Sequence, residues 1–201
     1  MNIVCFGDSI THAAGLAEGD RWPPILQAKL NEWKPGRFDV HNRGMGAHTT
    51  AQGLDRFAQD ALPLLPAVVL IQYGFNDANV LDWSRKSRVG LAEFKANLRE
   101  FHRAIRARKG RCVFIVNHTI GNPKLRTGNG KPYRTNFAPY NPAVRQVARA
   151  LRAPVIDLPA MMKKRKIVLG RFLTDDGIHL SAEGNHLYAD MVFEALKTIL
   201  R

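Results

Sequence analysis

Hydrophobic and polar residues follow a repeating order along the chain, in which short apolar runs alternate with longer amphipathic segments. The short runs have the length and composition of β-strands and lie at residues 2–6, 37–43, 67–73, 112–118 and 153–158. The segments between and after them carry apolar residues at helical spacing. They predict helices over residues 22–33, 49–60, 91–108, 141–152 and 181–200.

This alternation of strands and helices predicts an α/β fold, with a parallel sheet covered by helices on both faces. The nearly continuous apolar runs are typical of strands that are buried on both sides. Residues 121–137 interrupt the pattern, because they are polar and rich in Gly, Pro, Asn and Lys, and we expect a long loop there. With 201 residues and no repeat or internal linker, the chain is expected to form a single domain over residues 1–201.

Polar and flexible residues follow the predicted strands. In an open parallel sheet, binding sites lie at the carboxyl ends of the strands, so these segments are the first candidates for chemistry. They are "GDS" at 7–9, "NRGMGAHTT" at 42–50, "GFND" at 74–77, "NHT" at 117–119 and "TDDGIH" at 174–179. We therefore expect one edge of the sheet to carry the functional groups.

Ser9 stands where the first strand stops and a helix begins. It either caps that helix or is presented to a substrate. A serine nucleophile needs a base within hydrogen-bond reach and a group that orients the base. His179 and Asp176 supply both if their segment makes a tight turn, and Gly177 between them makes such a turn easier. The three side chains form a candidate catalytic triad.

Attack of a serine on an acyl carbon also creates an oxyanion, which needs hydrogen-bond donors that are already in position. The side-chain amide of Asn76 is one candidate donor. A backbone N–H of the glycine-containing segment 44–47 and the N–H of Ser9 are the others.

Four segments together resemble the signature blocks of the SGNH hydrolase superfamily, the GDSL-type esterases and lipases. They are "FGDSIT", "NRGMGAHTT", "YGFND" and "LTDDGIHLSAEGNHLYA", and they occur in the family's order between residue 3 and about residue 190. The resemblance implies a flavodoxin-like three-layer α/β/α fold with five parallel strands in the order 2-1-3-4-5. It implies Ser9 as nucleophile, His179 as base and Asp176 as its partner, with no metal and no cofactor.

The resemblance further implies an oxyanion hole formed by Asn76, the N–H of Ser9 and a backbone N–H of the second block. The chain departs from the family there, because Ala47 stands where glycine is usual. Alanine can serve if its φ is negative, whereas a positive φ would strain it. We expect Ala47 to be the donor, with the adjacent Gly46 as the alternative.

Three further residues are candidates for substrate contact, because they follow the third and fourth strands. Phe75 replaces a residue that is often small and polar in the family, and it either narrows the pocket or packs in the core. Asn117 and His118 end the fourth strand and are expected near the cleft, with a structural role as the alternative.

The net charge of the chain adds anionic molecules to its candidate binding partners. Thirty Lys and Arg against 17 Asp and Glu give a net charge of +13, which favours anionic partners such as nucleic acid, a membrane surface or an acidic substrate. The charges are spread and no nucleic-acid-binding motif occurs, so we expect no nucleic acid, while contact with an anionic surface stays open. No apolar run is long enough for a transmembrane helix.

The N-terminal residues lack the pattern of a signal peptide, so a cytoplasmic location is expected unless a leader precedes them. Cys5 and Cys112 lie in apolar strand segments and are expected to be buried thiols.

The sequence as a whole predicts a serine esterase that acts through an acyl-enzyme intermediate. No stripe of large apolar residues marks a lipid channel, which favours short, acetyl-type esters of small molecules, carbohydrates or lipids. A lysophospholipase, a thioesterase and a catalytically silent basic binding module are the alternatives. A metal-dependent phosphoesterase is a less favoured alternative. Its metal ligands would be Asp8, Asn76, Asp77, His118 and His179, whereas such sites usually have more acidic and histidine ligands at close spacing.

Overall fold

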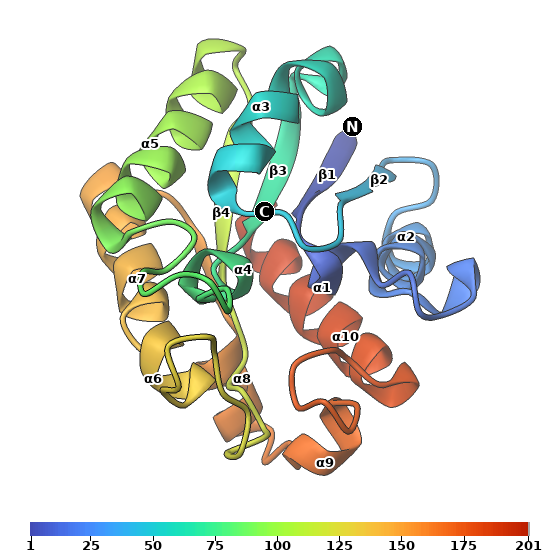
Figure 1. Ribbon diagram of the computed structural model, residues 1–201. Coiled ribbons are helices and arrows are strands. Elements are labelled where there is room, and N and C mark those ends of the chain that lie inside the picture. The colour runs from blue at the N-terminus through green and yellow to red at the C-terminus, as the bar shows by residue number, and fades with distance from the viewer. Residues whose placement is uncertain (201) are drawn as a thin grey trace.

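A sheet of five parallel strands forms the middle layer of the computed structural model, which describes residues 1–200 (Figure 1). The strands are β1 (Asn2–Gly7), β2 (Asp39–Gly44), β3 (Ala67–Gln72), β4 (Arg111–Val116) and β5 (Val155–Asp157). They lie in the order β2-β1-β3-β4-β5, and every neighbouring pair is parallel. The predicted flavodoxin-like strand order is confirmed.

Helices cover both faces of this sheet (Figure 1). On one face α2 (Trp22–Trp33) packs against α10 (Ala182–Ile199). On the other, α5 (Leu91–Ala107) lies between α3 (Thr50–Asp60) and α7 (Tyr140–Leu151). Five shorter helices connect these elements: α1 (Ser9–His12), α4 (Phe75–Ala78), α6 (Tyr133–Phe137), α8 (Leu158–Lys164) and α9 (Leu169–Phe172). Two short 3₁₀ helices span Glu18–Asp20 and Leu62–Leu64. None of the helices within this range is long and apolar enough to cross a membrane.

The core lies on both sides of the central strands. On the α3 and α5 side, Phe6 packs edge-on against Phe57 with ring centroids 5.1 Å apart, and Phe101 completes the cluster. On the α2 and α10 side, the rings of Trp22 and Tyr188 lie 4.8 Å apart. All of these rings are buried. Burial on both faces explains why the central strands β1, β3 and β4 are mostly apolar instead of alternating, whereas the edge strand β2 is polar and only partly buried.

The prediction of an unbroken loop over residues 121–137 is wrong in its last part, where α6 forms. Tyr133 and Phe137 stand one helical turn apart and both point into the interior. The hydroxyl of Tyr133 donates to the carbonyl of Phe75 at 2.6 Å, and the Phe137 ring stacks on Phe75 at 4.5 Å. This aromatic pair stabilises a helix that the polar composition around it concealed.

Gly44, the last residue of β2, lies directly against α1. A Cβ at this position would come within 2.2 Å of the backbone nitrogen of His12 and 2.6 Å of the backbone carbon of Thr11. Backbone atoms cannot rotate away as a flexible side chain can. The contact therefore holds α1, which begins at Ser9, close to the end of β2.

We expect the Gly44→Ala variant to lose about 2 kcal/mol or more of unfolding free energy, because the added methyl group overpacks a backbone contact. Urea denaturation measures this loss. Gly46→Ala is the control, since the nearest atom to its new Cβ is a side-chain nitrogen of His12 at 3.9 Å. Equal stability of the two variants would contradict the role assigned to Gly44.

Candidate active site

Ser9 is the first residue of α1 and follows β1 after a single intervening residue, Asp8. The cap of this helix is Asp8, whose Oδ1 accepts a hydrogen bond from the Ile10 N–H at 3.0 Å. Thr11 ties the helix to β3 by donating to the side-chain oxygen of Gln72 at 2.8 Å. Because Asp8 supplies the cap, the Ser9 hydroxyl is free for another partner.

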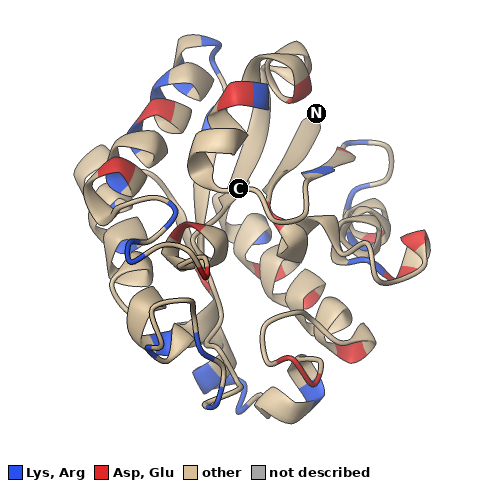
Figure 2. Cartoon of the chain, viewed as in Figure 1, with Lys and Arg blue, Asp and Glu red and all other residues tan. Residues whose placement is uncertain are grey.

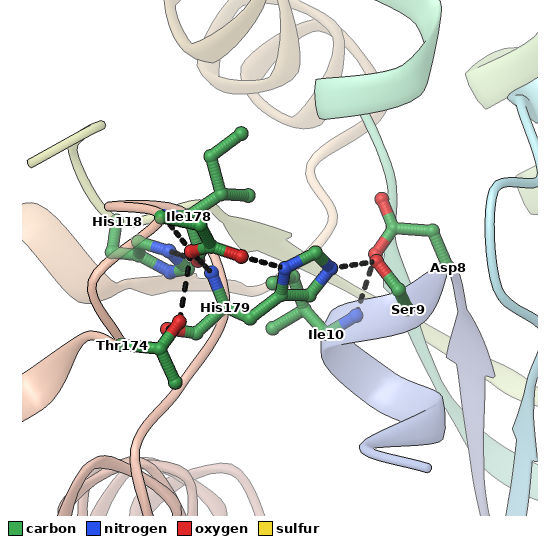
Figure 3. A network of polar contacts seen from close by, with 8 residues as sticks. Asp8, Ser9, Ile10, His118, Thr174, Ile178 and His179 are labelled. Atoms are coloured by element: carbon green, nitrogen blue, oxygen red, sulfur yellow. Dashed lines mark hydrogen bonds and ion pairs between the residues drawn. The ribbon is translucent and has the colours of Figure 1, made fainter. Parts of the chain in front are cut away.

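That partner is His179, which lies 170 residues away in the chain. The His179 Nε2 atom is 2.9 Å from the Ser9 Oγ, and the His179 Nδ1 atom is 2.6 Å from Oδ2 of Asp176 (Figure 3). A carboxylate only accepts hydrogen bonds, so Nδ1 carries the proton and Nε2 is left to accept the Ser9 proton. The structure thus brings together the three residues that the sequence predicts, in one chain of hydrogen bonds.

Asp176 divides its two oxygen atoms between the imidazole and its own loop. Oδ1 accepts from the Thr174 hydroxyl at 2.8 Å and from the N–H groups of Ile178 and His179 at 2.8 and 2.9 Å. Partial burial acts to raise the pKa of Asp176, but the hydrogen bonds from His179, from the two N–H groups and from Thr174 outweigh it. The pKa of Asp176 is therefore held well below its usual range, and the carboxylate stays ionised.

The loop that carries Asp176 and His179 is fastened to the segment after β4. Nε2 of His118 donates to the carbonyl of Ile178 at 2.7 Å, and the N–H of Gly121 donates to the carbonyl of Gly177 at 2.7 Å. Gly177 has a φ of +74°, and a Cβ there would lie 2.3 Å from the Asn122 nitrogen. Only glycine fits this close, left-handed turn.

Of the two roles left open for Asn117, His118 and Phe75, substrate contact or a structural role, their burial favours the structural one. Asn117 and His118 are 0% exposed and Phe75 is 3% exposed. Asn117 accepts from the Gln72 side chain at 2.9 Å and donates to the Tyr73 carbonyl at 2.8 Å, which joins β4 to β3. Burial lowers the pKa of His118 to about 4, so it is neutral and holds the loop through Ile178. All three side chains lie in the protein interior next to the site and have a structural role there.

The candidate oxyanion donors lie beside Ser9 in the loop after β2 and at the start of α4. Within residues 1–200, no protein group accepts from the N–H of Ser9, Gly46 or Ala47. The Asn76 side-chain amide gives one hydrogen to the carbonyl of His48 at 3.2 Å and keeps a second one available. Gly46, the alternative to Ala47, lines the cavity that contains Ser9.

Ala47 has a φ of +62°, the left-handed conformation that strains a residue with a Cβ. The Arg88 side chain holds it there, since one guanidinium nitrogen donates to the Ala47 carbonyl at 2.8 Å and the other to the Gln52 side chain at 2.9 Å. Sequence reasoning missed Arg88, which lies 41 residues from Ala47 and belongs to no motif. It also missed Thr174, although this residue stands inside the quoted "TDDGIH" segment.

Two further carboxyl groups are buried next to the site. Burial raises the pKa of Asp8 to about 7 and that of Asp77 to about 6, although hydrogen bonds from Ile10 and Thr50 lower them in part. In the described residues, one oxygen of each carboxyl group has no hydrogen-bond partner. Each charge is therefore costly at neutral pH, and the folded state favours the protonated acids more than the unfolded chain does.

The structure also bears on the alternative functions, a metal-dependent phosphoesterase and a basic binding module. Among residues 1–200, no group of three or more His, Cys, Asp or Glu side chains is arranged to hold a metal ion, which removes support for the phosphoesterase alternative. Lys and Arg lie on helices and loops on several sides of the molecule in Figure 2, not in a single patch. Cys5 and Cys112 are buried free thiols, as predicted.

We expect the Asp8→Asn variant to gain stability relative to the wild type as the pH rises from about 5 to about 8. The folded pKa of Asp8 is raised, so its ionisation weakens folding between the unfolded and folded pKa values, and asparagine removes that penalty. Thermal unfolding at several pH values measures the difference in Tm. The control is Asp175→Asn, which alters an exposed carboxylate. A difference for Asp8→Asn that does not change with pH would contradict the assignment.

We also expect Ala47→Gly to raise the unfolding free energy by up to about 1 kcal/mol, since glycine adopts a positive φ without strain. Ala17 is a suitable comparison, because its φ of −55° is ordinary for alanine. Ala17→Gly should lower the unfolding free energy by about 0.5–1 kcal/mol through the greater freedom of the unfolded chain. Chemical denaturation that shows equal losses in the two variants would refute the strain at Ala47.

Comparison with known proteins identifies the family. Residues 5–187 match the GDSL-like lipase/acylhydrolase family. An isoamyl acetate-hydrolyzing esterase 1 homolog from Rattus norvegicus is 31% identical, over 91% of this chain and 76% of that protein. The lipase/acylhydrolase from Enterococcus faecalis superposes with a TM-score of 0.79 at 28% identity, covering 98% of this chain and 95% of the other. Axe2, an acetylxylan esterase from Geobacillus stearothermophilus, shares the fold with a TM-score of 0.79 at 22% identity, covering 97% and 93%. The chain belongs to the GDSL-like lipase/acylhydrolase family and is a hydrolase of ester bonds.

Proposed function

We propose that the protein is a serine esterase that hydrolyses carboxylic esters through an acyl-enzyme intermediate on Ser9. The observation that carries this proposal is the continuous hydrogen-bonded chain from Ser9 through His179 to Asp176, with distances of 2.9 and 2.6 Å. The 2.9 Å distance lies in the range that allows proton transfer from the nucleophile to its base, and the 2.6 Å hydrogen bond orients that base. The comparisons support the ester class of the substrate.

In the first half of the reaction, the Ser9 Oγ attacks the carbonyl carbon of the ester while His179 Nε2 takes the hydroxyl proton. The ionised Asp176 stabilises the imidazolium that forms. The N–H of Ser9, the N–H of Ala47 or Gly46, and the Asn76 amide donate to the negative oxygen of the tetrahedral intermediate. When this intermediate collapses, His179 returns the proton to the departing alcohol, and the acyl group stays on Ser9.

In the second half, a water molecule takes the place of the alcohol. His179 accepts a proton from this water as it attacks the acyl carbon, and the same donors hold the oxyanion again. Collapse of the second intermediate releases the carboxylic acid, and the proton returns from His179 to the Ser9 Oγ. The side chains of His179 and Asp176 are each 48% exposed, so water reaches the site without a structural change.

We infer that the acyl group is short and acetyl-like. The relative from Rattus norvegicus is named for hydrolysis of isoamyl acetate, in which the acyl group has two carbons. The Enterococcus faecalis neighbour is named only as a lipase/acylhydrolase, which sets no chain length. A short acyl group is also consistent with the burial of Phe75, Phe137 and Tyr133.

Replacing Ser9 by alanine should lower kcat/KM for p-nitrophenyl acetate about 10³-fold or more, because the nucleophile is lost while the donors remain. Release of p-nitrophenolate measures the rate. Ser84→Ala serves as the control, since the Ser84 hydroxyl is exposed and bonds to the backbone of its own turn at Lys86. A Ser9→Ala enzyme as active as the wild type would mean that Ser9 is not the nucleophile.

Asp176→Asn should lower kcat about 10³-fold, because a neutral amide no longer stabilises the imidazolium or fixes the tautomer of His179. The neighbouring Asp175 provides a matched control, since it is exposed and lies outside the hydrogen-bonded chain. Steady-state kinetics on the same ester compares the two variants. If both retain wild-type kcat, the assigned role of Asp176 fails.

A further inference from the structure

A cavity of about 400 Å³ opens beside Ser9, and its walls come from two segments that are far apart in the sequence. Residues 12–16, which follow the nucleophile, form one wall. The other is formed by His179 and the three residues after it, which lead into α10. The volume lies at the small end of the range for ligand pockets in proteins, so the group that fills it must be compact.

The lining of this cavity carries no strong charge, in contrast to the rest of the protein. None of its lining residues, all of which lie in the described part of the chain, is Lys, Arg, Asp or Glu. The whole chain nevertheless carries 30 Lys and Arg. Ile10, Leu16 and Leu180 supply apolar surface, and Ala14 and Ala182 leave space beside them. A charged group would find no Lys, Arg, Asp or Glu side chain to pair with here, so the cavity favours an uncharged alkyl group.

The position of His179 decides which half of the ester faces this cavity. The departing alcohol receives its proton from His179 Nε2, so the alcohol oxygen must lie beside that atom. The cavity wall continues directly from His179 into Leu180 and Ala182. Of the candidate oxyanion donors, Asn76 and Ala47 are not part of the lining, whereas Ser9 and Gly46 are. The alcohol group therefore extends from His179 into the cavity.

We propose that this cavity is the alcohol subsite of the enzyme and that it selects compact, uncharged alkyl alcohols. The inference rests on the proposed esterase function and adds to it the chemical class of the leaving group. In this arrangement the alcohol, not the acid, is the half of the ester whose size and charge the protein discriminates. The subsite is emptied when the alcohol departs, before water attacks the acyl-enzyme.

The test fills the cavity by changing Ala182, the first residue of α10, to leucine. The ratio of kcat/KM for isoamyl acetate to that for methyl acetate should fall at least tenfold, because the added side chain displaces several carbon atoms of the larger alcohol. The matched control is Ala92→Leu, at the second position of α5, which is exposed and lines no cavity near Ser9. The control should keep the wild-type ratio.

Two further substrates separate the outcomes. Methyl hexanoate and methyl acetate differ only in the acyl group, so Ala182→Leu should leave their ratio as in the wild type. A loss confined to methyl hexanoate would show that the cavity holds the acyl group, and it would overturn the inference while the esterase function stood. An acetate ester whose alcohol carries a carboxylate should be a poor substrate; faster hydrolysis of that ester than of isoamyl acetate would also overturn it.

A second variant keeps the test decisive if Ala182→Leu does not fold. Leu16→Ala enlarges the opposite wall, so it should raise the ratio of cyclohexylmethyl acetate to methyl acetate hydrolysis severalfold, and an unchanged ratio would count against the subsite. Failure of the esterase function itself is distinguishable, because the wild type would then hydrolyse these esters no faster than Ser9→Ala does.

Discussion

The site depends first on the parallel pairing of β1 with β2 on one side and with β3 on the other. In this register Gly7 lies opposite both Gly44 and Gln72, so the three strands end at the same level. The residues that continue each strand must then emerge side by side, however far apart they stand in the chain. Parallel pairing thus places Ser9, the loop after β2 and the start of α4 around one small volume. The remaining member, the loop with His179, reaches this volume because the segment after β4 holds it by hydrogen bonds.

The resemblance of four short motifs to the GDSL-type family was sufficient to predict the strand order, and the same motifs predicted that Ser9, Asp176 and His179 lie together, as they do. The sequence left two roles open for Asn117 and His118, substrate contact or a structural role, because position at a strand end does not determine the direction of a side chain. Both side chains are buried and hydrogen-bonded in the interior. The contact of Arg88 with Ala47 was out of reach for another reason. It joins two loops, and nothing local in either segment signals the other.

The positively charged side chains of the protein lie away from the cavity beside the nucleophile. Its strong net positive charge is carried by exposed helices and loops, while the cavity beside Ser9 has a neutral lining. The buried carboxyl groups of Asp8 and Asp77 lie behind the site, where desolvation favours their protonated forms. The ionised Asp176 is instead stabilised by four hydrogen bonds at the surface. Position relative to solvent therefore assigns different roles to carboxyl groups of the same chemistry.

The cap of α1 has a consequence for how this protein tolerates change. Asp8, not Ser9, satisfies the free N–H at the start of the helix, and within residues 1–200 the hydrogen-bond partner of the Ser9 hydroxyl is His179. The nucleophile thus contributes little to folding, and its replacement leaves the backbone around it intact. A chain without its reactive oxygen would still assemble the same pocket, and an ester bound there would not be cleaved through Ser9. Loss of the Ser9 hydroxyl during evolution would likewise abolish catalysis and leave a folded protein with the same pocket.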